Sequence, residues 1–301
     1  MSDQLPPAPP PPPDSPDQPP YGQPPYGQPG NPYGADPYGT GPYGAAQMEP
    51  RVQLDVHGLR PQRRWTVLIR LILAIPQIIV LYLLFLAGFF VVIVGWFAAL
   101  FTGHLPTGIR EFLIGILKYQ VRVHGYLLLL VDEYPPFAFF DAPDYPIQVE
   151  VPPATRLNPA AVFFRIILVF PAWIISDVVM TGAGIVSFFV WVIMLFTGRQ
   201  PEPAFGATSA AFRYSTRTIA YFGMLTPTYP KELFGEVPSA ADRRSPTRPL
   251  LLSSGARVLL IVMIVVGAIG AFFSGERNND WANDNSLPPA HTISVPVTPV
   301  P

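Results

Sequence analysis

The chain has 301 residues, of which 50% are hydrophobic and 13% are charged, and its formal net charge is −1. This balance excludes the dense basic surface that binding to nucleic acid requires, and the lack of cysteine excludes disulfides, thiolate metal sites and cysteine nucleophiles. Because residues 1–50 carry almost no apolar side chains, the rest of the chain is far more hydrophobic than the average, which indicates an integral membrane protein.

The first segment, residues 1–50, is rich in proline, tyrosine and glycine. Five tyrosines are each followed by glycine: Tyr21, Tyr26, Tyr33, Tyr38 and Tyr43. This composition cannot bury a core, so we expect a disordered cytoplasmic tail, and it has none of the features of a signal peptide. The regular spacing could bind partner proteins, but composition alone favours the alternative of a solvated tether.

The first apolar run extends from Val67 to Phe101 and follows a basic cluster that ends at Arg63 and Arg64. Basic residues before a hydrophobic segment place the N-terminus in the cytoplasm. At about 1.5 Å per residue the run would form a helix of roughly 50 Å, longer than a hydrocarbon core of about 30 Å. Pro76 therefore predicts a break, after which residues 77–101 cross the membrane and end at the turn Thr102-Gly103.

The next segment, residues 108–131, mixes charged and apolar side chains. This pattern predicts either an amphipathic helix at the membrane surface or a span packed against other helices, and the sequence leaves both open. The run Asp132-Glu133-Tyr134-Pro135-Pro136 ends the helix, and an acidic loop leads on to Glu150.

The whole unit then recurs 95 residues later without a gap. The equivalent positions include Arg70 and Arg165, Pro76 and Pro171, Trp96 and Trp191, Gly103 and Gly198, and Tyr134-Pro135 and Tyr229-Pro230. Because many of these identities are not aliphatic, they indicate a tandem duplication. We predict an all-α membrane fold of two direct repeats, each with about two membrane helices, followed by a single C-terminal span.

The arginines also predict the topology. Both repeats open with arginine, which favours direct repeats that start on the same face over an inverted pair. A basic linker then precedes the apolar segment 258–273, whose crossing would place the C-terminus outside. The expected parts are the tail 1–50, repeat one 51–145, repeat two with its linker 146–240, the basic linker and span 241–275, and a disordered tail 276–301.

A candidate functional face lies on the second helix of each repeat. Helical spacing places Tyr119, Arg122 and Tyr126 on one side, and the same residue types recur as Tyr214, Arg217 and Tyr221. An arginine between tyrosines could bind a lipid headgroup or another anion. The simpler interpretation, which we favour, is an arginine anchored at the interface or paired inside the bundle.

Three further charges lie within the apolar runs: Arg70, Arg165 and Asp177. Charges inside a membrane segment suggest a functional site, but both arginines lie near the start of a run and could reach the interface. Asp177 is found only in the second repeat. It could neutralise Arg165, bind a cation or lie in a hydrated part of the interface.

These motifs resemble a known family. The sequences WFAALFTGHLP and KYQVRVHGYLLLLVDEYPPF, with the second forms WVIMLFTGRQP and RYSTRTIAYFGMLTPTYP, are similar to the bacterial, mostly actinobacterial, membrane family catalogued as domain of unknown function 4389. The resemblance covers residues 59–235, and repeat two departs from it by having Pro227-Thr228 before Tyr-Pro. It implies a membrane protein and supplies no activity, substrate or catalytic residue.

No catalytic, nucleotide-binding or metal-binding motif is found in the sequence. We therefore expect no enzyme, no catalytic residue, no metal and no cofactor, but a multi-pass scaffold or accessory protein of the cell membrane. The alternatives are a small transporter or channel, and a lipid-binding protein that uses the Tyr-Arg-Tyr face. The expected partners are membrane lipids, proteins bound by the N-terminal tail and further copies of the chain, and nucleic acid is not expected.

Overall fold

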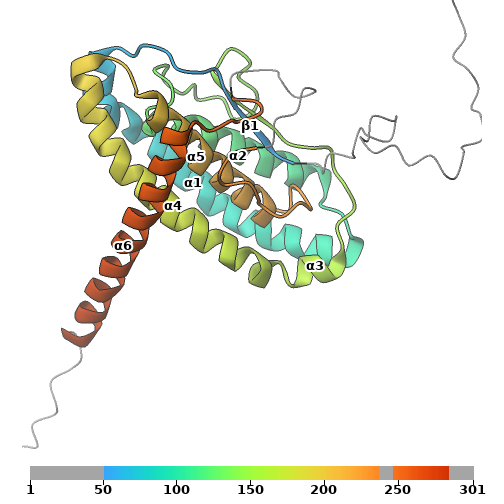
Figure 1. Cartoon of the computed structure of the whole chain (residues 1–301). Helices are drawn as coiled ribbons and strands as arrows, with labels where there is room; N and C mark the ends of the chain where they lie inside the picture. The colour runs from blue at the N-terminus through green and yellow to red at the C-terminus, as the bar shows by residue number, and fades with distance from the viewer. Residues whose placement is uncertain (1–50, 237–246, 285–301) are drawn as a thin grey trace, which may run out of the picture. The chain divides into compact units, whose positions relative to one another are not determined.

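The computed structural model describes residues 51–236 and 247–284, with side chains as far as Phe273 (Figure 1). Its elements are β1 Gln53–Val56, α1 Arg64–Thr102, α2 Thr107–Leu127, β2 Ile147–Glu150, α3 Pro159–Phe163, α4 Arg165–Thr197, α5 Glu202–Phe222 and α6 Ser254–Asp284. The predicted helical membrane fold with two repeats is confirmed. The two short strands are an addition that the sequence did not suggest, and the tail 1–50 lies outside the described residues.

The break expected at Pro76 is wrong. The helix α1 is continuous over 39 residues and contains Pro76, just as α4 contains Pro171. A proline in a long apolar helix removes one backbone hydrogen bond, and the bonds of the flanking turns keep the helix intact. Repeat two does have an interruption, but it lies earlier, between α3 and α4 at Phe164. The predicted turns are confirmed, because Gly103 and Gly198 end the helices at φ 71° and 69°.

Each repeat folds as a helical hairpin in which α2 packs along α1 and α5 along α4. The close approach in repeat one is at Gly88, where an added Cβ would lie 2.8 Å from Ile116. Within the part of the chain that the structure describes, three helices are long and apolar enough to cross a membrane: α1, α4 and residues 254–273 of α6. The helices α2 and α5 are not among them, in keeping with the amphipathic alternative for residues 108–131.

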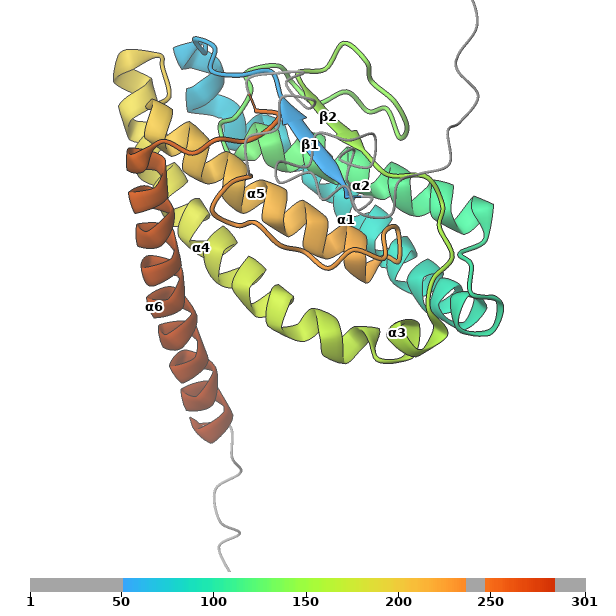
Figure 2. The ribbon, with the colours of Figure 1, turned by 45° about the vertical axis from the view of Figure 1, so that its right-hand side comes forward.

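A third layer covers the face of α2 and α5 that points away from α1 and α4 (Figure 2). It contains β1, β2 and the loops around them. Phe139 of this layer packs on Gly115 of α2, and Ile147 at the start of β2 packs on Gly125. The order is therefore an apolar layer of α1 and α4, a middle layer of α2 and α5, and an outer layer of strands and loops.

The repeats are related by an approximate two-fold rotation that passes through the strands. In the antiparallel ladder Leu54 lies opposite Val149, which is its own equivalent in the other repeat. The backbone N–H of Gln62 donates to the oxygen of Gly198 at 2.9 Å, and the equivalent Leu157 donates to Gly103 at 2.9 Å. These contacts between repeats are thus made twice.

These reciprocal bonds determine the directions of the long helices. The residue before the start of α1 lies beside the end of α4, and the residues before α4 lie beside the end of α1. The two helices therefore run in opposite directions. The segment 128–157, which carries β2, starts beside the beginning of α1 and returns to its far end.

The helix α6 packs against α4 through glycines. A Cβ on Gly182 would lie 1.8 Å from the backbone oxygen of Met263, and one on Gly267 would lie 1.9 Å from that of Val178. Small residues allow the two backbones to touch, which is how helices associate in lipid. The helix α6 extends to Asp284, and residues 285–301 lie outside the described part.

Candidate functional site

Arg70 of α1 lies at the centre of a buried polar junction at the end of α2. Its side chain is 1% exposed, and its guanidinium lies 4.4 Å from the ring centre of Tyr126. The guanidinium donates to the backbone oxygen of Tyr126 at 2.6 Å and to Oε1 of Gln62 at 2.7 Å. Asp132 lies 3.5 Å away and supplies the opposite charge. The interior arginine is therefore both hydrogen-bonded and neutralised.

The end of α2 is shaped to form this junction. Leu129 has φ 65°, and the N–H of Leu130 returns to the oxygen of Gly125, as in a helix end that turns left-handed. The turn exposes the oxygen of Leu129, which accepts a hydrogen bond from Gln62 at 2.6 Å. Met224 repeats this geometry at φ 59° in the other half.

Arg165 forms the second junction with fewer partners. Its side chain is 4% exposed, its guanidinium lies 4.1 Å from the ring centre of Tyr221, and Nη2 donates to the oxygen of Thr226 at 2.7 Å. Its buried Nε has no hydrogen-bond partner. The positions equivalent to Gln62 and Asp132 are Leu157 and Pro227. Within the described ranges, Arg165 forms no ion pair.

The predicted face of α2 is divided among separate contacts. The hydroxyl of Tyr119 bonds to Gln77, and Tyr126 lies under Arg70. Arg122 donates to the oxygen of Phe140 at 2.9 Å and to that of Ala138. Burial lowers the pKa of Arg122, and Tyr145 is the largest of the groups that oppose this shift. All three predicted residues lie in the interior, in the arrangement expected of a structural arginine.

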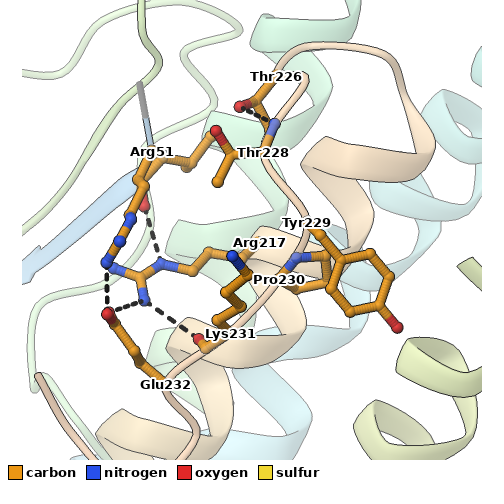
Figure 3. Close-up of a pocket in the computed structure, with 9 residues that line it drawn as sticks. Arg51, Arg217, Thr226, Thr228, Tyr229, Pro230, Lys231 and Glu232 are labelled. Atoms are coloured by element: carbon orange, nitrogen blue, oxygen red, sulfur yellow. Dashed lines mark hydrogen bonds and ion pairs between the residues drawn. The ribbon is translucent and has the colours of Figure 1, made fainter. Parts of the chain in front are cut away.

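The equivalent face of α5 also points into the protein. Arg217 donates from Nε to the oxygen of Val52 at 3.1 Å, and Glu232 joins it to Arg51 (Figure 3). The ring of Tyr221 lies against Arg165. The third residue, Tyr214, is buried, and burial raises the pKa of its hydroxyl to about 12. The six predicted residues are therefore brought into the core of the two repeats, but at different contacts.

One charged cluster was missed by the sequence analysis. Arg213 of α5 lies 2.8 Å from Glu236, which also contacts Arg217. Burial lowers the pKa of Arg213 to about 10, so it stays charged at neutral pH. Burial alone would raise the pKa of Glu236, but Arg213 and Arg217 outweigh it and lower that pKa. The repeat could have indicated this pair, because Lys118 is equivalent to Arg213 and Asp141 to Glu236. In repeat one these two residues also form an ion pair.

Asp177 lies apart from both junctions. It is exposed on α4 and lines a cavity of about 200 Å³ between α4 and α5. The polar groups of this cavity are Ser176, Ser215 and Thr218. The suggested pairing of Asp177 with Arg165 is not formed in the described residues, because Arg165 contacts Thr226 and Tyr221 instead.

Two apolar cavities lie between the repeats. One of about 340 Å³ is lined by α1, α2, α4 and α5, and one of about 310 Å³ by α1, α4 and α5. They share the lining residues Phe89, Val92 and Phe222, and we call these two adjoining cavities together the inter-repeat groove. Its lining is hydrophobic except for Arg165 at one end.

The three apolar helices and the duplicated hairpin define a helical membrane protein with two repeats. The family called Domain of unknown function (DUF4389) matches residues 64–138 and again residues 159–233, so the chain belongs to this family as a tandem copy of its domain. The predicted family is thereby confirmed, and the matches include Arg70 with Tyr126 and Arg165 with Tyr221. No curated protein and no solved structure shows significant similarity to the chain.

Proposed function

We propose that the chain is a non-enzymatic membrane scaffold whose two repeats lie in the cytoplasmic leaflet, with α6 as the segment that crosses the bilayer. The observation that carries this proposal is the layered distribution of exposed side chains. Large hydrophobic residues are exposed along the whole of α1, from Trp65 at its start, which is 77% exposed, to Phe101 at its end, which is 82% exposed. The outer layer carries exposed charges instead, at Arg60, Glu133, Asp141 and Glu150.

A full crossing by α1 and α4 would be costly. The outer layer packs on α2 halfway along the repeats, so upright helices would hold β2 and its loops at the depth of the hydrocarbon. Exposed backbone and charges such as Asp141, whose side chain is 73% exposed, are not tolerated there. With α1 and α4 lying along the membrane, the apolar layer meets lipid and the charged layer meets water.

This placement also accounts for the arginines of both repeats. Helices in opposite directions would put Arg64 and Arg156 on different faces of the membrane if both crossed it. In a single leaflet both lie on the cytoplasmic side, as the positive charge before each repeat favours. The N-terminus is then inside and the C-terminus outside, because α6 begins beside α5 on the same side.

Single cysteines test the placement, since the chain has none of its own. His104→Cys and Arg199→Cys lie at equivalent ends of α1 and α4, and both are exposed. A membrane-impermeant maleimide should label both only after the cytoplasmic face is opened, while Ser294→Cys should be labelled on intact cells. Labelling of His104→Cys and Arg199→Cys from opposite faces would show that α1 and α4 cross.

The scaffold function itself requires partners of the N-terminal segment. We propose that residues 1–50 bind cytoplasmic proteins, which the arrangement of the repeats would hold at the membrane. Full-length chain should retain partners after purification in mild detergent, and a chain that starts at Arg51 should lose them. A matched full-length chain with the five tail tyrosines changed to serine shows whether partners recognise the tyrosines or need only a tail of this length. Identical partners for all three chains would contradict the scaffold.

A second candidate function is transport, and the polar cavity beside Asp177 favours it. An acidic group with three hydroxyls nearby has the chemistry of a cation pathway. Reconstituted liposomes would then carry a cation flux that Asp177→Asn abolishes, with Tyr82→Phe at the equivalent position as control. Flux equal to that of empty liposomes would exclude this function.

A further inference from the structure

The two arginine junctions differ in the charge that balances them. Arg70 has the carboxylate of Asp132 at 3.5 Å and the amide oxygen of Gln62 at 2.7 Å. In repeat two these positions hold Pro227 and Leu157, and neither can accept a side-chain hydrogen bond. The arginine is retained although both of its side-chain acceptors are lost. A buried cation without an anion is costly, so an acceptor from outside the chain would be stabilising.

The surroundings of Arg165 specify the kind of acceptor. Arg165 lies at one end of the inter-repeat groove and is 4% exposed, and its Nε, like that of Arg70, has no hydrogen-bond partner. The groove follows α1 from Phe85 to Phe97, which corresponds to roughly 18 Å of helix. Apart from Arg165 its lining offers apolar side chains, which fit a hydrocarbon chain.

We propose that Arg165 binds the anionic headgroup of a membrane phospholipid whose acyl chain lies in the inter-repeat groove. The phosphate takes the place that Asp132 has beside Arg70, and the acyl chain fills the space between Phe89, Val92 and Phe222. Charge-assisted bonds between guanidinium and phosphate are strong in such a dry site. The proposal does not rest on the scaffold or on transport, although the groove shares Trp173, Ile219 and Phe222 with the cavity beside Asp177.

The sharpest variant is Pro227→Asp, because it restores the internal carboxylate that repeat one uses. Protein in nanodiscs of phosphatidylglycerol and phosphatidylcholine should retain one phosphatidylglycerol on release into native mass spectrometry. Pro227→Asp and Arg165→Gln should each weaken that retention about tenfold or more, the loss expected for a charge-assisted bond. Arg64→Gln, which changes an exposed arginine, should retain lipid as the unchanged chain does.

A groove-filling variant and the melting temperatures of all variants test the proposal further. Val92→Phe fills the groove and should reduce retention of either lipid while leaving Arg165 intact. Melting temperatures show whether each variant folds, and Pro227→Asp should melt no lower than the unchanged chain because it adds an ion pair. Equal retention of phosphatidylglycerol by Pro227→Asp, preference for phosphatidylcholine, or displacement of the phospholipid by a free fatty acid would each overturn the proposal.

Discussion

Trp96, near the end of α1, donates its indole N–H to the backbone oxygen of Val162 in the other repeat at 2.8 Å. The equivalent Trp191 donates to Val67 at 2.7 Å. Trp96 therefore fixes the end of α1 to α3, which directly precedes α4, and Trp191 fixes the end of α4 to the start of α1. These are among the few polar contacts that the long apolar helices make, and they orient the repeats within a largely non-directional apolar surface.

Replacing either tryptophan should weaken the contact between repeats. Trp96→Phe or Trp191→Phe removes the indole hydrogen bond between the repeats, which should cost about 0.5–1.5 kcal/mol in unfolding free energy. Thermal unfolding in detergent, followed by circular dichroism, measures the effect. Trp65→Phe is the matched control because Trp65 is 77% exposed. Equal melting temperatures for all three variants would show that the indole hydrogen bonds do not stabilise the contact between repeats.

Glu236 should be among the most sensitive carboxylates of the described residues. It neutralises Arg213, which is buried and also donates to the oxygen of Leu54 at 2.7 Å, so it links α5 to β1. Glu236→Gln leaves a buried cation and should cost about 3–5 kcal/mol. Glu133→Gln is the control, because its pair with Arg60 is exposed and should contribute below about 1 kcal/mol. Denaturant titration measures the free energy of unfolding of both variants, and equal losses would contradict the prediction.

The same carboxylate predicts an acid sensitivity. Because the pKa of Glu236 is lowered in the folded protein, its stabilising effect is complete above the unfolded pKa of about 4.3 and is lost as pH falls through the lower folded value. Melting temperature should therefore decline below about pH 4.3 less steeply in Glu236→Gln than in the unchanged chain. Parallel declines would show that another group is responsible.

His124 predicts a second, milder pH dependence. Its ring stacks on Phe212, and burial lowers its pKa, while a hydrogen bond with the backbone oxygen of Gln120 opposes the shift. The unfolded chain binds the proton below a pKa of about 6.5 and the folded chain binds it only at lower pH, so stability should fall as pH drops below that value. His124→Phe should remove this part of the decline, and His104→Phe, an exposed control, should keep it. The comparison uses melting temperatures at pH 8 and pH 5.

The packing of α6 on α4 depends on Gly182. A Cβ there would meet the backbone of Met263 at 1.8 Å, whereas one on Gly184 meets nothing within 4 Å. Gly182→Ala should therefore separate the two helices and Gly184→Ala should not. The pair Thr181→Cys and Gly270→Cys reports the contact by disulfide formation. Unchanged cross-linking in Gly182→Ala would show that the backbones can shift without cost.

The sequence was sufficient to predict the repeat, the membrane class and the helix ends at Gly103 and Gly198, because these depend on local composition and on equivalent positions. It could not show that Pro76 lies within a helix, since the backbone hydrogen bonds of the flanking turns keep α1 continuous in spite of the low helix propensity of proline. Nor could it show that Tyr119, Arg122 and Tyr126 contact different partners. Tyr119 contacts Gln77, Arg122 contacts the backbone oxygen of Phe140, and Tyr126 contacts Arg70. No local motif of the sequence indicates these pairings.

The ladder contact of Leu54 with Val149 has a consequence for how such a chain can change. A residue on a two-fold axis faces a copy of itself when two identical subunits associate, so a single substitution there alters both sides at once. Fusion of the two copies removes this constraint, and the axis position holds leucine on one side and valine on the other. The same freedom allows one arginine junction to keep its aspartate while the other, with Pro227, becomes open to a new ligand.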